Sequence, residues 1–214
     1  TFNQKEAKEY REFLQPLTEA ERLCAVLIQF PWSFKANAEN WEYAAKLFAE
    51  FGEYPLALEV RHDSWWKPDY FERLRARGVA LANIDQPALS HNILPDEVAT
   101  APLAYVRFHG RNEQAWWAKE EEYPGARYDY LYSRGELIEW KERVDRLTQT
   151  AKSTLIIMNN HHRGDAVVNG MEIATLLHVQ KGEVPRPLYE LHPKHYEATG
   201  LPVEKVNRQM DLFG

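Results

Sequence analysis

Short apolar runs alternate with amphipathic stretches along most of the chain. The run Leu23–Phe30 is continuous and short, which is typical of a parallel strand buried on both faces, and four similar runs follow it. The predicted strands cover residues 23–30, 55–61, 79–84, 103–108 and 154–158.

Helical periodicity fills the intervals between these runs. We expect helices at residues 41–51, 68–78, 134–150 and 166–179, with residues 1–22 helical in pieces. Asn40 is the expected cap of the first, and Thr18–Glu21 and Ser133–Glu136 have the spacing of capping boxes. The proline-containing segments 86–102 and 184–193 are predicted to be irregular.

A repeated strand–helix alternation predicts right-handed crossovers and a parallel sheet, so the expected fold class is α/β. The polar clusters of this chain all follow strands. Functional sites of parallel sheets lie at the carboxyl ends of the strands, so these clusters are the first place to look for chemistry.

The composition, 44% hydrophobic and 27% charged over 214 residues, is that of an ordinary globular domain. No run approaches the ~18 apolar residues of a membrane span. The single cysteine, Cys24, lies in an apolar run and is expected to be buried, which makes a reducing cytoplasm the default location. A net charge of −6 argues against a broadly basic nucleic-acid binder. An anion site would therefore need a local group of arginines.

The residues expected to form such a site follow four different strands. They are Glu59, Arg61, His62, Asp85, Arg107, His109, Arg111, Asn159, Asn160, His161, His162 and Asp165. Arginine forks match phosphate or carboxylate, and the turn before residue 165 opens a helix whose start suits a phosphate. The structural alternative is that Arg61 and Arg107 form buried ion pairs with Glu59 and Asp85.

Two other chemistries fit the same residues. Glu59 or Asp85 could act with His109 in acid–base catalysis without a metal. A divalent metal is the less favoured alternative, because no close-spaced ligand motif is present and the adjacent His161 and His162 would face opposite ways on an extended chain. The sequence assigns no metal ligand, and the cofactor stays unknown.

Several short motifs resemble the DUF72 family. They lie at Glu59–Trp65, Arg107–Arg111, Asn159–Asn169 and Gln29–Phe34, together with Asp85 after its strand. The resemblance implies a TIM-type (β/α) barrel of essentially unassigned function, and it adds Trp65 and Asn169 to the residues expected to bind substrate. Five strands are predicted where a barrel needs eight, so the chain resembles a barrel without its first three units.

A long loop, Trp116–Tyr132, is rich in aromatic side chains. It could stack bases or sugars, or simply pack over the barrel mouth.

The end of the chain, Gln209–Phe213, resembles the bacterial sliding-clamp binding motif. Leu212 and Phe213 would enter an apolar pocket of the clamp while Gln209 makes polar contacts beside it. The alternative is that both apolar side chains pack back onto the protein itself. We therefore expect a partial barrel domain at residues 1–193 and a tail at 194–214.

Two functions are compatible with these features. The first is a phosphoester hydrolase of endonuclease type that acts on a nucleotide or nucleic acid. The second is a non-catalytic ligand- or DNA-associated protein that the sliding clamp recruits through the tail. Neither involves a membrane.

Overall fold

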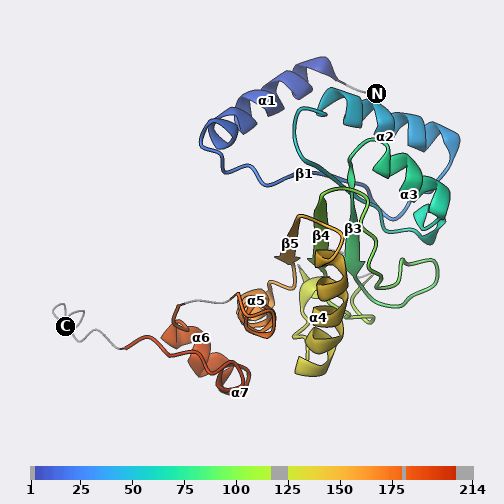
Figure 1. The fold of residues 1–214 in the computed structure, drawn as a ribbon. Coiled ribbons are helices and arrows are strands. Elements are labelled where there is room, and N and C mark those ends of the chain that lie inside the picture. The colour runs from blue at the N-terminus through green and yellow to red at the C-terminus, as the bar shows by residue number, and fades with distance from the viewer. Residues whose placement is uncertain (1–2, 117–124, 180–181, 206–214) are drawn as a thin grey trace. The chain divides into compact units, whose positions relative to one another are not determined.

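A computed structural model describes residues 3–116, 125–179 and 182–205 of the chain (Figure 1). It separates into two compact units. The first consists of Thr1–Arg107 with Arg146–Ile156, and the second of Phe108–Asp145 with Ile157–Gly214.

Five strands form one sheet in the order β1-β2-β3-β4-β5. The strands are β1 (Val26–Gln29), β2 (Leu56–Glu59), β3 (Ala80–Asp85), β4 (Leu103–Phe108) and β5 (Ser153–Met158), most of whose residues belong to the first unit. The pairing of β1 with β2 and of β2 with β3 is parallel, and its register places Gln29 opposite Glu59. The α/β class and all five predicted strands are confirmed. The sheet of the described residues is open, with β1 and β5 at its two ends.

The helices come before, between and after the strands, with α1 preceding β1 (Figure 1). They are α1 (Gln4–Glu19), α2 (Ala38–Glu50), α3 (Pro68–Arg75), α4 (Arg134–Thr148), α5 (Asp165–Leu176), α6 (Arg186–Leu191) and α7 (Pro193–Glu197), with 3-10 turns η1 (Asp63–Trp65), η2 (Ala126–Tyr128) and η3 (His162–Gly164). None of the helices in the described ranges is both long enough and apolar enough to cross a membrane.

Local sequence signals account for most of these boundaries. α3 begins with Pro68, whose fixed φ suits the first helical turn. The capping box before α4 is confirmed: Glu136 Oε2 accepts hydrogen bonds from Ser133 N and Ser133 Oγ, both at 2.8 Å. The segment 86–102 contains no helix or strand, as predicted.

Other local predictions were wrong. Thr18 does not cap a helix, because it lies inside α1 and its hydroxyl donates to Leu14 O. Asn37, not Asn40, caps α2. The segment 184–193 was expected to be irregular, but it contains α6 and the start of α7. Pro185 is the N-cap of α6, and Pro187 and Pro193 lie in the first turns of α6 and α7, where a missing N–H costs nothing. Cys24 is exposed, because β1 begins only at Val26.

The irregular segment after β3 is held to the sheet by side chains instead of by strand pairing. Asn83 is fully buried, and its Oδ1 accepts from Val98 N at 2.7 Å while its Nδ2 donates to Val98 O at 3.0 Å. Thr100 Oγ1 accepts from Leu81 N and donates to Val79 O, both at 2.7 Å. These two side chains pair with backbone N–H and C=O groups that a neighbouring strand would otherwise have to pair.

Replacing Asn83 with alanine should lower the free energy of unfolding by about 1–3 kcal/mol, since both peptide groups of Val98 lose their partner. Urea unfolding of the two proteins measures the difference. Gln149→Ala removes an exposed amide and serves as the control. A loss at Asn83 no larger than that of the control would contradict the pinning role.

Candidate functional site

The buried carboxylate of Glu59 is the centre of a polar cluster at the strand ends of the first unit. Arg61 Nε and Nη2 lie 3.2 Å from Glu59 Oε1, and Arg107 Nη1 lies 2.7 Å from Oε2. Arg107 Nη1 also donates to Gln29 Oε1. The parallel register explains the meeting, because Gln29 and Glu59 are paired last residues of β1 and β2.

The charges in this cluster are largely withdrawn from water. The Glu59 side chain is 0% exposed, and the side chains of Arg61 and Arg107 are 12% and 14% exposed. A buried carboxylate is tolerated only when cations and hydrogen bonds compensate it, and two guanidinium groups do so here. The expected structural ion pairs therefore exist for Glu59.

The same contacts leave donors that face away from the carboxylate. Among the residues that the structure describes, Arg61 Nη1 has no protein acceptor, because Arg61 holds Glu59 through its other two nitrogens. A guanidinium fixed in this way presents its remaining N–H groups in one orientation. Such a group suits an oxygen anion.

Two more predicted site residues of the first unit are completely or almost completely buried. Asp85 ends β3 and is 0% exposed. Trp65 is 2% exposed, stacks on Phe34 with ring centroids 5.5 Å apart, and donates its indole N–H to Phe34 O at 2.7 Å. These contacts make Trp65 part of the core of this unit.

The second unit contains the predicted imidazole, His109, which is fully buried. Its Nδ1 lies 3.3 Å from Asn159 Nδ2, and the rings of Trp116 and Tyr128 lie 6.4 and 6.3 Å from it. Trp116 is 4% exposed, which favours packing over stacking for this ring. Trp117 and Tyr123 of the same aromatic loop lie outside the described residues.

Asn160 and Asn169 form a buried amide network instead of an open site. Asn169 Oδ1 accepts from Tyr132 N and Asn160 Nδ2, and Asn169 Nδ2 donates to Tyr132 O and Glu172 Oε2, at 2.8–3.0 Å. Asn160 Nδ2 also donates to Tyr130 O at 2.9 Å. Their donors thus already hold the segment before α4, so their predicted role in anion binding has no support in this geometry.

Arg111 is placed against the capping box of α4. Its Nη1 lies 3.0 Å from Glu136 Oε1, which also accepts from Tyr130 Oη at 2.7 Å. Burial opposes ionisation of Glu136, but the hydrogen bonds from Tyr130 and Ser133 and the charge of Arg111 outweigh it, so the pKa of Glu136 is lowered.

The remaining predicted residues have separate partners. His161 Nδ1 lies 3.0 Å from Asn159 O, His162 Nε2 lies 3.5 Å from Asp129, and Asp165 lies 3.5 Å from His192 Nε2. Burial is the main cause that raises the pKa of Asp165. The tail residues Gln209, Leu212 and Phe213 lie outside the described residues.

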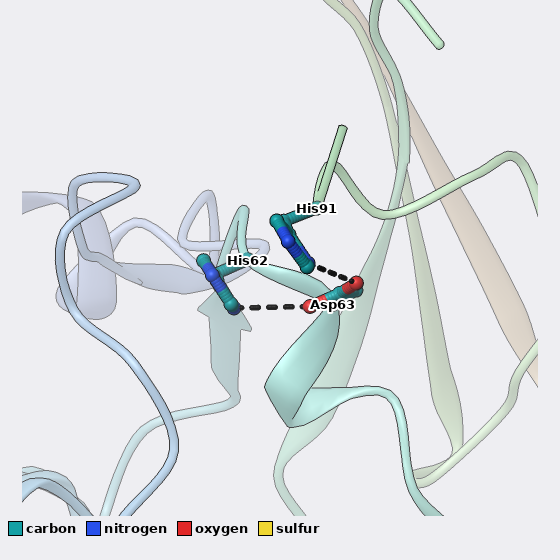
Figure 2. Close-up of side chains that lie close together, drawn as sticks. All are labelled: His62, Asp63 and His91. Atoms are coloured by element: carbon teal, nitrogen blue, oxygen red, sulfur yellow. Dashed lines mark hydrogen bonds and ion pairs between the residues drawn. The ribbon is translucent and has the colours of Figure 1, made fainter. Parts of the chain in front are cut away.

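Sequence reasoning missed one cluster, which lies directly after β2. His62 Nδ1 lies 3.1 Å from Asp63 Oδ1, and His91 Nδ1 lies 3.1 Å from Asp63 Oδ2 (Figure 2). Burial lowers the pKa of His62. All three side chains line an open pocket of about 690 Å³ that belongs wholly to the first unit. His62 was among the predicted residues, but no local pattern points to His91, which is 29 positions away along the chain.

Comparison with known proteins gives a consistent family. Residues 2–194 match the family described as "Protein of unknown function DUF72". The UPF0759 protein YunF of Bacillus subtilis is 32% identical over 188 residues, which are 84% of this chain and 67% of that protein.

Solved structures agree. A DUF72 family protein from Thermotoga maritima is 37% identical with a TM-score of 0.75, covering 81% of this chain and 65% of that one. A DUF72 family protein from Enterococcus faecalis is 30% identical with a TM-score of 0.76, covering 84% and 68%. The chain thus spans about two thirds of the length of these relatives.

Replacing Glu136 with glutamine should lower the free energy of unfolding by about 1–3 kcal/mol at pH 7, because it weakens hydrogen bonds to a charged acceptor. The pKa of this carboxyl is lowered in the folded protein. Its contribution is therefore fully present above the ordinary value of 4.5 and is lost as the pH falls through the lowered value.

Denaturant unfolding at pH 7 and pH 3, with the exposed Glu139→Gln as the control, measures this dependence. An effect of Glu136→Gln that is equal at both pH values would contradict the proposed ionisation.

Proposed function

The chain belongs to the DUF72 family, and from this premise we propose that it binds a phosphate-bearing ligand, a nucleotide or nucleic acid, at the strand ends of its first unit and hydrolyses a phosphoester there. One observation carries the proposal: two guanidinium groups, those of Arg61 after β2 and Arg107 in β4, are fixed on one buried carboxylate. Fixed guanidinium forks recognise phosphate oxygens with little loss of side-chain entropy.

The overall charge supports local recognition. With a formal net charge of −6, the protein does not attract polyanions over its whole surface. A phosphate that binds must therefore gain its energy from a few preorganised donors, and Arg61 Nη1 is such a donor.

The roles of the carboxylates follow from their contacts. Both oxygens of Glu59 contact guanidinium groups, which stabilises the charged form and makes Glu59 a positioning residue for the arginines. Asp85 stays the candidate for proton transfer in the first unit, and the catalytic role of His109, in the second unit, stays a separate prediction. We also propose that the five strands are part of a closed (β/α) barrel. Such a barrel has eight strands, and five of eight is close to the 65–68% of the solved relatives that this chain covers.

Binding is tested with fluorescent abasic, nicked and single-stranded DNA, with inorganic phosphate as the competitor. Arg61→Gln should weaken binding by about tenfold to a hundredfold, because charge-assisted hydrogen bonds are lost. The affinity of Arg61→Lys should lie between those of the unmodified protein and Arg61→Gln, because lysine keeps the charge but lacks the planar guanidinium fork. The exposed Arg22→Gln is the control, and thermal unfolding checks that each variant is folded. Failure of the unmodified protein to bind any of these DNAs, or equal binding by Arg61→Gln, would contradict the proposal.

The reaction is tested on the same DNAs with and without Mn²⁺, Mg²⁺ and Zn²⁺. Cleavage that is lost in Arg107→Ala and Asp85→Asn supports the hydrolase at the strand ends of the first unit. Binding without cleavage would support the proposed ligand binding and contradict the proposed hydrolase activity.

A second candidate function rests on the terminal motif Gln209–Phe213. We propose that this tail recruits the protein to the bacterial sliding clamp, where it acts as a non-catalytic partner if the reaction test fails. A pull-down on purified clamp should retain the full chain and lose Phe213→Ala almost completely, because an apolar anchor dominates such docking. Equal retention of the two proteins would rule out recruitment through the tail.

A further inference from the structure

The cluster of His62, Asp63 and His91 in the first unit brings together three side chains that ligate metals. One donor atom from each lies within 4.8 Å of the other two. The two imidazole rings are parallel, with an interplanar angle of 4°, and both approach the same carboxylate (Figure 2). Each ring contacts a different oxygen of Asp63.

The contact between His62 and Asp63 is hard to explain as an ion pair. His62 Nδ1 accepts a hydrogen bond from Ser64 N at 3.1 Å, and a backbone N–H can only donate. Nδ1 therefore carries a lone pair and not a proton. Two acceptor atoms, His62 Nδ1 and Asp63 Oδ1, thus lie 3.1 Å apart. A cation beside them would replace this repulsion with coordination, and His62 Nδ1 would give up its contacts with Ser64 N at 3.1 Å and Ser64 Oγ at 2.9 Å.

Backbone hydrogen bonds hold the segments that carry these residues against each other. Asp63 N donates to His91 O at 2.9 Å, and Ile93 N donates to Arg61 O at 3.1 Å. His91 adopts a left-handed conformation with φ of +62°, which is uncommon outside glycine. The segment that carries His91 is therefore held against the start of η1 by backbone hydrogen bonds, which fixes the position of the imidazole.

From this geometry we propose that His62, Asp63 and His91 form a binding site for a divalent transition-metal ion of the Zn²⁺ class. An ion held at about 2.0–2.2 Å by nitrogen and oxygen separates neighbouring donors by about 3.0–3.4 Å, depending on its coordination number. The two contacts of 3.1 Å agree with this separation for an ion held by both oxygens of Asp63, because each imidazole contacts a different one. Two imidazoles and one carboxylate favour Zn²⁺ over Mg²⁺, which prefers oxygen ligands.

The surroundings indicate that the site is open. Three protein ligands leave at least one position of the ion for water or a ligand, which distinguishes catalytic from structural zinc sites. The pocket of about 690 Å³ provides room there, and Lys67 and Asp96 also line it. This inference goes beyond the proposed phosphate binding, because it uses none of the arginines.

Zinc binding by the full chain, freed of metal with a chelator, is measured by calorimetry and by competition with a chromogenic chelator. The unmodified protein should bind one Zn²⁺ whose affinity falls by at least about tenfold in Asp63→Asn and in His91→Asn. Asparagine retains the size of Asp63 and tolerates the left-handed backbone at position 91.

Two matched controls exist in the chain. Asp69→Asn changes an exposed aspartate in the first turn of α3. His178→Asn changes an exposed histidine that is also left-handed, with φ of +58°. Both should bind Zn²⁺ like the unmodified protein. X-ray absorption at the zinc edge should show two imidazole ligands.

Absence of stoichiometric Zn²⁺ binding, or unchanged binding by both Asp63→Asn and His91→Asn, would overturn the proposal. If Asp63→Asn is unfolded by circular dichroism, His91→Asn decides, because its side chain is 62% exposed and its loss leaves the core intact. No nucleic acid is used, so failure here is separate from failure of phosphate binding.

Discussion

The buried carboxylate of Glu59 must be compensated where it lies, and the polar edge of the first unit follows from that constraint. All four residues of β2 are buried, so the strand ends in a charge that water does not solvate. Arg61 and Arg107 supply the compensating charge from beyond β2 and from β4. Parallel pairing makes this feasible, because it aligns the carboxyl ends of successive strands at one edge. The ion pairs and the sheet therefore depend on each other.

Asparagine side chains solve a different problem in both units. Asn83 forms a two-point contact with the peptide groups of Val98, and Asn169 forms the same contact with Tyr132. In each case Oδ1 accepts from the backbone N–H while Nδ2 donates to the carbonyl of the same residue. The amide thus replaces a neighbouring strand and satisfies an irregular segment that would otherwise bury unpaired groups.

Features that depend on interactions between residues close together in the sequence could be predicted from it, and most features that depend on distant residues could not. The five strands and the cap at Ser133 were found because they depend on residues within a few positions. The predicted capping role of Thr18 was wrong because α1 does not end at Pro16 but continues to Glu19, so that Thr18 lies in its last turn. The prediction that residues 184–193 are irregular was wrong because proline was interpreted as a helix breaker, whereas proline in a first turn is compatible with the start of a helix.

The site was less predictable than the fold for the same reason. Residue type and strand position brought Glu59, Arg61 and Arg107 to one cluster correctly, because strand order decides their meeting. Asn169 was identified through resemblance to the family, yet its contacts with Tyr132, 37 positions away, follow no spacing in the sequence; its contact with Glu172 is an i,i+3 contact within α5. His91 reaches Asp63 only because a loop crosses back, and loop paths leave no periodic signal.

One short segment connects both polar clusters of the first unit. Glu59 and Arg61 lie on the same side of an extended chain and contact each other, whereas His62 contacts Ser64 as the N-cap of η1. The carbonyl of Arg61 also accepts from Ile93 N, which fixes the loop that carries His91. The side chain of Arg61 therefore serves the carboxylate cluster while its backbone supports the histidine cluster. Glu59, the last residue of β2, and the four residues Arg61–Ser64 thus contribute to two chemically different sites, and β2 sets the position of both.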